Sequence, residues 1–149
     1  MQTGQIIRAL SGFYDVQSEG KINRTRARGN FRKRKITPLD GDFVEFESES
    51  ETDSGYILEI LDRKNEMIRP PVANIDNAVV IVSAVEPAFS LNLLDRFLIY
   101  IESLHMQGLV YLTKTDMISD QQYQEISDYL AYYAKIGYQI FAPRTAFTP

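Results

Sequence analysis

No cysteine occurs among the 149 residues, so disulfides and thiolate metal sites are excluded, and a reducing compartment fits this composition. Imidazole chemistry is limited to His105, the only histidine. The longest aliphatic run, Ala78 to Val82, is far shorter than the roughly 20 residues of a membrane span, and the first residues lack the apolar region of a signal peptide. We therefore expect a soluble cytoplasmic protein with no membrane partner.

Basic and acidic residues are separated along the chain, although the net charge is only -4. Residues 1–39 contain nine Lys or Arg against two Asp or Glu, residues 40–66 contain two against ten, and residues 67–149 contain five against eight. An acidic net charge argues against nucleic-acid binding, but phosphate binding depends on local clusters of cations. The N-terminal segment is therefore a candidate for binding nucleic acid.

Residues 4–68 have the pattern of short strands divided by turns, with no helical period. The strands are expected at residues 4–16 with a bend at Gly12, and at residues 21–28, 43–46, 56–61 and 64–68. On the second strand Ile22, Arg24 and Arg26 share one face, which makes this face basic. Five short strands indicate a small closed β-barrel; the OB-fold is the commonest nucleic-acid-binding type of this size, and an SH3-like barrel is the alternative.

The sequence Arg69-Pro70-Pro71 predicts a domain boundary, because proline lacks the amide donor that strand pairing needs. We expect an OB-fold RNA-binding domain at residues 1–68 and a second domain at residues 69–149. Residues 77–85 form a nearly continuous Val/Ile/Ala run, as expected for a parallel strand that is covered on both faces.

Helix and strand patterns alternate after this run. They predict a helix from Ser90 to Gly108, a strand at residues 109–112, a helix that is capped by Ser119 and Gln122 and ends at Gly137, and a strand at residues 138–141. The order β-α-β-α-β indicates a parallel sheet with right-handed crossovers. Ligands of such sheets bind beyond the carboxyl ends of the strands.

The most specific short motif, Thr113-Lys114-Thr115-Asp116, follows the predicted strand at residues 109–112. It matches the [Asn/Thr]-Lys-x-Asp pattern by which GTP-binding proteins recognise guanine. The Asp116 carboxylate can accept from the two neighbouring guanine donors, N1–H and the amine, which adenine does not offer. The stem of Lys114 can lie over the purine, and Thr113 can hydrogen-bond nearby backbone. A plain strand-to-helix turn with solvated Lys and Asp is the alternative.

Seven cations lie within the twelve residues from Arg24 to Lys35: Arg24, Arg26, Arg28, Arg32, Lys33, Arg34 and Lys35. Such a cluster gives affinity for phosphates, and we expect Phe31 to be an exposed aromatic that stacks on an unpaired base. The alternatives are a solvated loop, or an intramolecular partner for the acidic residues 45–53.

These acidic residues lack the central Gly and closing Glu of a cation loop, so we expect a solvated hairpin loop and no metal site. His105 has the position of a helix cap or packing residue.

Four segments in this order resemble the small ribosomal subunit biogenesis GTPases of the RsgA/YjeQ type: residues 26–42, 69–76, 94–98 and 113–116. The resemblance covers nearly the whole chain. It implies an OB-fold, then a GTPase domain in circularly permuted order, with guanine recognition before the phosphate loop, and a C-terminal zinc module. It also implies GTP or GDP with Mg²⁺ in the intact protein, a monomer, and binding to the small ribosomal subunit and its rRNA.

Several parts of this family pattern are missing from the sequence. No Gly-x-x-x-x-Gly-Lys-[Ser/Thr] motif, Asp-x-x-Gly segment or Cys/His zinc ligand set occurs, and residues 142–149 show no Ser-Ala element of a second guanine loop. In permuted order these parts follow residue 149, so we expect a truncated chain with an incomplete parallel sheet. We expect it to require no cofactor and not to hydrolyse GTP alone. The alternative function is a non-enzymatic RNA-binding adaptor with an α/β interaction domain.

Overall fold

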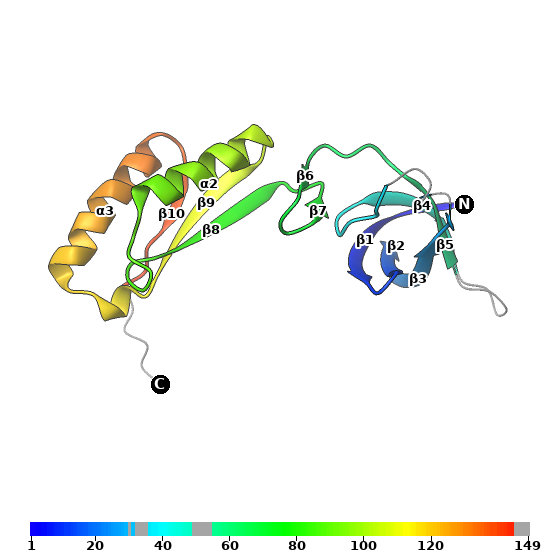
Figure 1. Ribbon diagram of the computed structural model, residues 1–149, viewed down its shortest axis with the longest axis horizontal. Helices are drawn as coiled ribbons and strands as arrows, with labels where there is room; N and C mark the ends of the chain where they lie inside the picture. Colours follow the sequence, from blue (N-terminus) through cyan, green and yellow to red (C-terminus); the bar gives the residue numbers. More distant parts are fainter. Residues whose placement is uncertain (30, 32–35, 49–54, 145–149) are drawn as a thin grey trace. The chain divides into compact units, whose positions relative to one another are not determined.

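The computed structural model describes residues 1–29, 31, 36–48 and 55–144, and the chain divides into two compact units, Met1–Ile75 and Asp76–Pro149 (Figure 1). The division lies several residues after the predicted boundary at Arg69. The reason is a small hairpin of β6 (Glu66–Met67) and β7 (Val72–Ala73), whose turn contains the two prolines. The amide of Ala73 donates to the carbonyl of Asp40 at 2.8 Å, so pairing continues past the prolines within the first unit.

The first unit is a closed five-stranded barrel. Its strands are β1 (Gln2–Leu10), β2 (Phe13–Ser18), β3 (Lys21–Ala27), β4 (Phe43–Glu47) and β5 (Gly55–Ile60). They pair in the order β1-β2-β3-β5-β4, and β4 pairs back onto β1. Only the β3–β5 pair of these strands is parallel. This Greek-key order is that of the OB-fold, as predicted.

Two of the expected barrel strands differ from the observed ones. The long strand expected at residues 4–16 is a hairpin, because Ser11 and Gly12 both have positive φ angles, 53° and 83°, and turn the chain tightly. The strand expected at residues 64–68 is not part of the barrel, since Glu66–Met67 pairs only with β7. The count of five barrel strands was therefore right, but the division of the sequence among them was partly wrong.

The barrel interior combines an apolar core with one buried ion pair. The core residues come from every barrel strand except β3 and from the segment after it: Ile6, Val16, Phe31, Val44, Phe46 and Ile57. Asp42 is 0% exposed, and its carboxylate accepts from Arg63 Nε at 2.7 Å and Nη2 at 2.8 Å. The hydrogen bond that Arg63 donates to Asp42 has the largest effect on the Arg63 guanidinium and raises its pKa above the ordinary value. Arg63 Nη2 also donates to the carbonyl of Thr37 at 2.9 Å.

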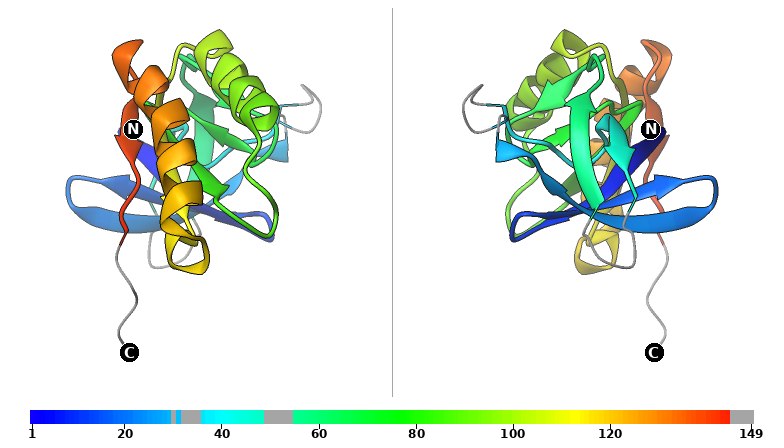
Figure 2. Two further views of the ribbon diagram at one scale, coloured as in Figure 1. Left: turned by 90° about the vertical axis from the view of Figure 1, so that its left-hand side faces the viewer. Right: turned by 90° about the vertical axis from the view of Figure 1, so that its right-hand side faces the viewer.

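The second unit is a parallel sheet with two helices. Its elements are β8 (Asn77–Ser83), α2 (Leu91–Ser103), β9 (Gln107–Thr113), η1 (Thr115–Met117), α3 (Asp120–Lys135) and β10 (Gln139–Phe141). Both strand pairs are parallel, in the order β10-β9-β8, which confirms the predicted β-α-β-α-β pattern. Helices α2 and α3 lie side by side against the strands (Figure 2), and Tyr133 of α3 donates to Asp95 of α2 at 2.5 Å. No helix in the described part of the chain is long and apolar enough to cross a membrane.

The helix caps explain where the helices begin and end. Ser90 caps α2 by accepting from the amide of Leu93, and Ser119 with Gln122 forms the predicted capping box of α3. Helix α3 ends before Gly137, as predicted. Helix α2 does not continue to Gly108. His105 has a positive φ of 55°, and its amide donates to the carbonyl of Glu102, so this residue ends the helix.

Gly108 has a different role from the one that the sequence predicted. It lies in β9, where an added Cβ would be 3.2 Å from a Leu98 side-chain carbon of α2. The absence of a side chain therefore allows α2 to pack closely on the sheet.

One face of the parallel sheet is apolar and exposed within the described residues. Ile81, Tyr111 and Phe141 lie side by side in the strand register, and Ile81 is 68% exposed. The opposite face is covered by α2 and α3, where Val110 and Leu112 are fully buried. The expectation that residues 77–85 are covered on both faces was therefore wrong for the described structure.

Candidate functional site

The Thr113–Asp116 segment lies at the carboxyl end of β9, at the edge where parallel sheets bind ligands. Strand β9 ends at Thr113, and Lys114 adopts a left-handed backbone with a φ of 59°. The chain then forms the short η1 helix, which contains Thr115 and Asp116. This turn reverses the chain immediately after the strand and leaves the side chains of Lys114 and Asp116 exposed.

Hydrogen bonds hold this loop to the neighbouring segments. Thr113 Oγ1 donates to the carbonyl of Val82 at 3.2 Å, so the loop is attached to the end of β8. The buried Thr115 donates to the carbonyl of Pro143 at 2.6 Å, which attaches it to the segment after β10. The Lys114 ammonium donates to the carbonyl of Glu86, in the connection between β8 and α2. The loop is therefore fixed by all three strand ends of the sheet.

The Asp116 carboxylate differs from the other polar groups of this loop. It is exposed and forms no hydrogen bond or ion pair with any residue that the structure describes. The two threonines on either side of Lys114 have backbone partners. The backbone that presents Asp116 is therefore fixed while its oxygens are free to accept from a ligand.

Arg144 is an additional contact of this loop that the sequence did not predict. Its guanidinium donates to the carbonyl of Thr115 at 2.6 Å and to that of Ile118 at 3.2 Å, and it pairs with Asp120 at 2.6 Å. It also lies 4.8 Å from the centre of the Tyr123 ring. One general rule could have indicated this contact. The carboxyl ends of parallel strands lie at the same edge of a sheet, and Arg144 follows β10 as Thr115 follows β9.

The basic face of β3 has the predicted arrangement. Arg24 and Arg26 are exposed, whereas Thr25 between them is buried and donates to the carbonyl of Tyr14 at 2.9 Å. Both guanidinium groups lie over the ring of Phe13, at 4.7 Å and 4.5 Å from its centre. Phe13 is opposite Arg26 in the strand register, so the aromatic ring supports both cations on the barrel surface.

Arg28 follows β3 and forms an ion pair with Glu47 at 3.0 Å, with both side chains about half exposed. The alternative, in which the basic cluster pairs with acidic residues of the same chain, is therefore observed at one described pair, Arg28 and Glu47. The four cations Arg32, Lys33, Arg34 and Lys35 lie outside the described residues, as do residues 49–53 of the acidic stretch. Within the described part of the chain, no group of three or more His, Asp or Glu side chains gathers as metal ligands do.

Phe31 is not the exposed aromatic that the sequence indicated. Its side chain is 2% exposed and belongs to the barrel core. The amide of Phe31 donates to the carbonyl of Arg28 at 3.1 Å, so the chain turns inward directly after the basic strand. Phe13, which the sequence analysis did not single out, is the aromatic that contacts the arginines. The alternation of side chains between the two faces of β2 could have identified Phe13. Val16 lies on the opposite face of the strand and is fully buried, so Phe13 faces outward.

The barrel and the parallel sheet together match solved structures of one class. The structure of YloQ, described as a circularly permuted GTPase, is 46% identical and superposes with a TM-score of 0.81 over 95% of this chain and 51% of its own. The structure of YjeQ from Thermotoga maritima gives the same TM-score and coverage at 27% identity. The fold is therefore that of the circularly permuted GTPases.

Sequence comparison gives the family. Residues 3–57 match the RsgA N-terminal domain and residues 60–146 match the RsgA GTPase domain. The chain is 87% identical over 149 residues to the small ribosomal subunit biogenesis GTPase RsgA of Latilactobacillus sakei, and 55% identical over 147 residues to that of Limosilactobacillus reuteri. The chain belongs to the RsgA family. The two matches cover 100% and 99% of this chain but only 50% and 49% of the relatives, so the chain spans about half their length.

Proposed function

We propose that the intact protein is a GTP hydrolase that acts in late maturation of the small ribosomal subunit. In this proposal the barrel binds rRNA through Arg24, Arg26, Arg28 and the segment Arg32–Lys35, and Thr113–Asp116 binds the guanine of GTP or GDP. The names of the two relatives, which describe small ribosomal subunit biogenesis GTPases, support this assignment. A cytoplasmic monomer follows from the same proposal.

The free carboxylate of Asp116 is the observation that best supports guanine recognition. A carboxylate that accepts from N1–H and the exocyclic amine needs both oxygens free and a fixed backbone. Asp116 follows an anchored Thr115 and has no partner among the residues that the structure describes. Hydrogen bonds to a charged acceptor contribute about 1.5–3 kcal/mol each, so two of them give a strong preference over adenine. Lys114 would cover the purine with its stem while its ammonium stays near Glu86.

The 149-residue chain is proposed to have no hydrolytic activity by itself. Its sequence contains no phosphate-loop motif, and phosphate and Mg²⁺ contacts supply most of the catalysis in such enzymes. Mg²⁺ and the family's zinc would therefore be bound by residues outside this chain. The role that remains for this chain is to bind RNA and the guanine base.

The guanine assignment is tested by Asp116→Asn in a chain extended to the full length of its relatives. An amide supplies a donor that suits the additional carbonyl of xanthine, so binding of GTP should weaken at least about tenfold and binding of XTP should strengthen. Asp128→Asn, an equal change on the exposed face of α3, is the control and should leave both affinities unchanged. Equilibrium titration with fluorescent nucleotides measures these values. An unchanged preference for GTP in Asp116→Asn would contradict the assignment and favour the adaptor function.

A further inference from the structure

A small pocket lies in the barrel beside the basic strand, and of its lining residues only Arg28 has a role in the function proposed so far. It has a volume of about 320 Å³ and is lined by Gly12, Tyr14, Ala27, Arg28, Gly29, Phe31, Ile36, Thr37 and Pro38. This volume is at the lower end of the range of about 300–1,000 Å³ that is typical of small-ligand sites. A space of this size suits a single ring system and not an extended segment.

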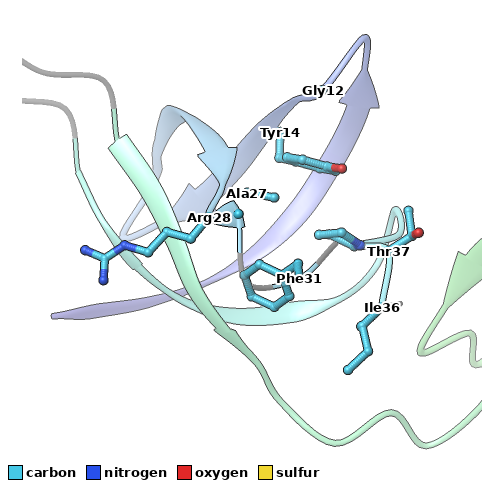
Figure 3. Close-up of a pocket in the computed structure, with 9 residues that line it drawn as sticks. Gly12, Tyr14, Ala27, Arg28, Phe31, Ile36 and Thr37 are labelled. Carbon is cyan, nitrogen blue, oxygen red and sulfur yellow. The ribbon is translucent and has the colours of Figure 1, made fainter. Parts of the chain in front are cut away.

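The walls of the pocket are both aromatic and polar. The Tyr14 and Phe31 rings and the Thr37 side chain surround one space, while the Arg28 side chain extends away from it (Figure 3). Thr37 is exposed, and its hydroxyl forms no hydrogen bond with a described residue. A flat ligand would therefore find a ring to stack on at Tyr14 and a donor and acceptor at Thr37.

Hydrogen bonds fix these walls in place. The amide of Ile36 donates to the carbonyl of Phe31 at 3.1 Å, which links two of the lining residues. The Thr37 carbonyl accepts from Arg63, whose guanidinium is anchored on the fully buried Asp42. The ion pair between Arg63 and Asp42 thus helps to hold the Thr37 wall of the pocket in place.

The position of the pocket identifies the class of ligand. Arg28 lines the pocket just after the strand that carries Arg24 and Arg26, while Tyr14 and Ala27 lie on the opposite strand face from Phe13 and Arg26. Residues 1–39 hold nine cations and only two acidic residues, so a ligand with phosphates is favoured here. An unpaired nucleotide of single-stranded RNA combines a flat ring with such phosphates.

We propose that this pocket binds one unpaired nucleobase of RNA, stacked on Tyr14 and hydrogen-bonded to Thr37, while a flanking phosphate contacts Arg28. This inference rests on RNA binding by the barrel and refines it, because it makes single-stranded RNA the preferred ligand over a duplex. Stacking on the ring tolerates different bases, so a strong sequence preference is not required.

Gly29 lines the pocket, so a large side chain at this position tests it. Its backbone is not left-handed, and an added Cβ would meet no atom within 4 Å, so the position accepts a side chain without strain. In the 149-residue chain, Gly29→Phe should weaken binding of a short single-stranded RNA by about tenfold, within the range known for loss of one stacked base. Gly29→Ala leaves the pocket open and is the matched control, with unchanged affinity. Duplex RNA should bind both variants and the wild type equally.

A second measurement needs no variant, so it stays decisive if Gly29→Phe fails to fold. The wild-type chain should bind an oligonucleotide of the same length that lacks its bases about tenfold more weakly, with an unchanged salt dependence. Equal affinity for the intact and abasic oligonucleotides would overturn the base pocket but leave RNA binding intact. Absence of binding to any RNA would instead overturn the proposed function of the barrel.

Discussion

The two units of this chain differ in how their β-structure is completed. The barrel closes when β4 pairs with β1, and its core is enclosed by its own strands. The parallel sheet is covered by α2 and α3 on one face, while Ile81, Tyr111 and Phe141 are exposed on the other. The comparison indicates that the barrel's stability is contained within this chain. The sheet leaves an apolar face uncovered within the described residues, and the relatives are about twice as long as this chain.

The largest predicted effect concerns the buried ion pair of the barrel. Arg63→Ala leaves the Asp42 carboxylate buried without its partner, which should cost about 3–5 kcal/mol in the free energy of unfolding. The loss should be confined to the barrel, so urea denaturation followed by NMR amide signals should show the second unit unchanged. Arg28→Ala removes the exposed pair with Glu47 and should cost only about 0.2–1 kcal/mol. Similar losses of unfolding free energy in the two variants would contradict the conclusion that the Arg63–Asp42 pair is enclosed in the barrel interior.

The next effect separates the two faces of the sheet. Leu112→Ala removes a fully buried side chain and should destabilise the second unit by about 2–5 kcal/mol. Ile81→Ala truncates a side chain on the exposed face, so the same chain should change by no more than about 0.5 kcal/mol. In a chain of the relatives' full length, the cost of Ile81→Ala should rise toward that of Leu112→Ala. An equally small cost in both lengths would show that this face stays uncovered.

A smaller effect concerns the hydrogen bond between the two helices. Burial, and after it the bond to Asp95, raises the pKa of Tyr133 to about 12. The folded state thus holds this proton more tightly than the unfolded chain, whose tyrosine pKa is about 10. The resulting stability is fully present below pH 10 and is lost as the pH rises toward 12.

Tyr133→Phe should therefore cost about 1 kcal/mol at neutral pH and reduce the loss of stability between pH 10 and 12. Chemical denaturation at several pH values measures both changes. Tyr129→Phe, on the same helix but half exposed, is the control and should behave as the wild type. An unaltered pH profile in Tyr133→Phe would assign the alkaline loss to other groups, of which Tyr138 is the first candidate because burial raises its pKa to about 12 as well.

The sequence predicted the features that depend on local periodicity and capping. The capping box of Ser119 and Gln122 and the basic face of Arg24 and Arg26 are present in the structure. The motif Thr113–Asp116 lies at the end of a strand, because a buried apolar run followed by a polar turn has few other arrangements. Its role in guanine binding remains a prediction.

Features that depend on distant parts of the chain were missed. Phe31 stands among cations in the sequence, and only the inward turn after β3 places it in the barrel core. The contact between Arg144 and Thr115 joins residues 29 positions apart, with no local signal in either segment. Residues 77–83 have the same apolar pattern whether one face or both are covered, so the sequence could not distinguish these arrangements.

The central claim is that the barrel binds RNA through the cations of β3, and the salt dependence of affinity tests it most directly. The 149-residue chain is titrated with a fluorescent fragment of small-subunit rRNA at several salt concentrations. The double variant Arg24→Ala/Arg26→Ala should weaken binding and flatten the log–log slope by about 0.7–0.9 per lost phosphate contact. Arg96→Ala/Lys135→Ala, an equal change of charge in the second unit, should leave the slope unchanged. The same slope in all three proteins would contradict the claim.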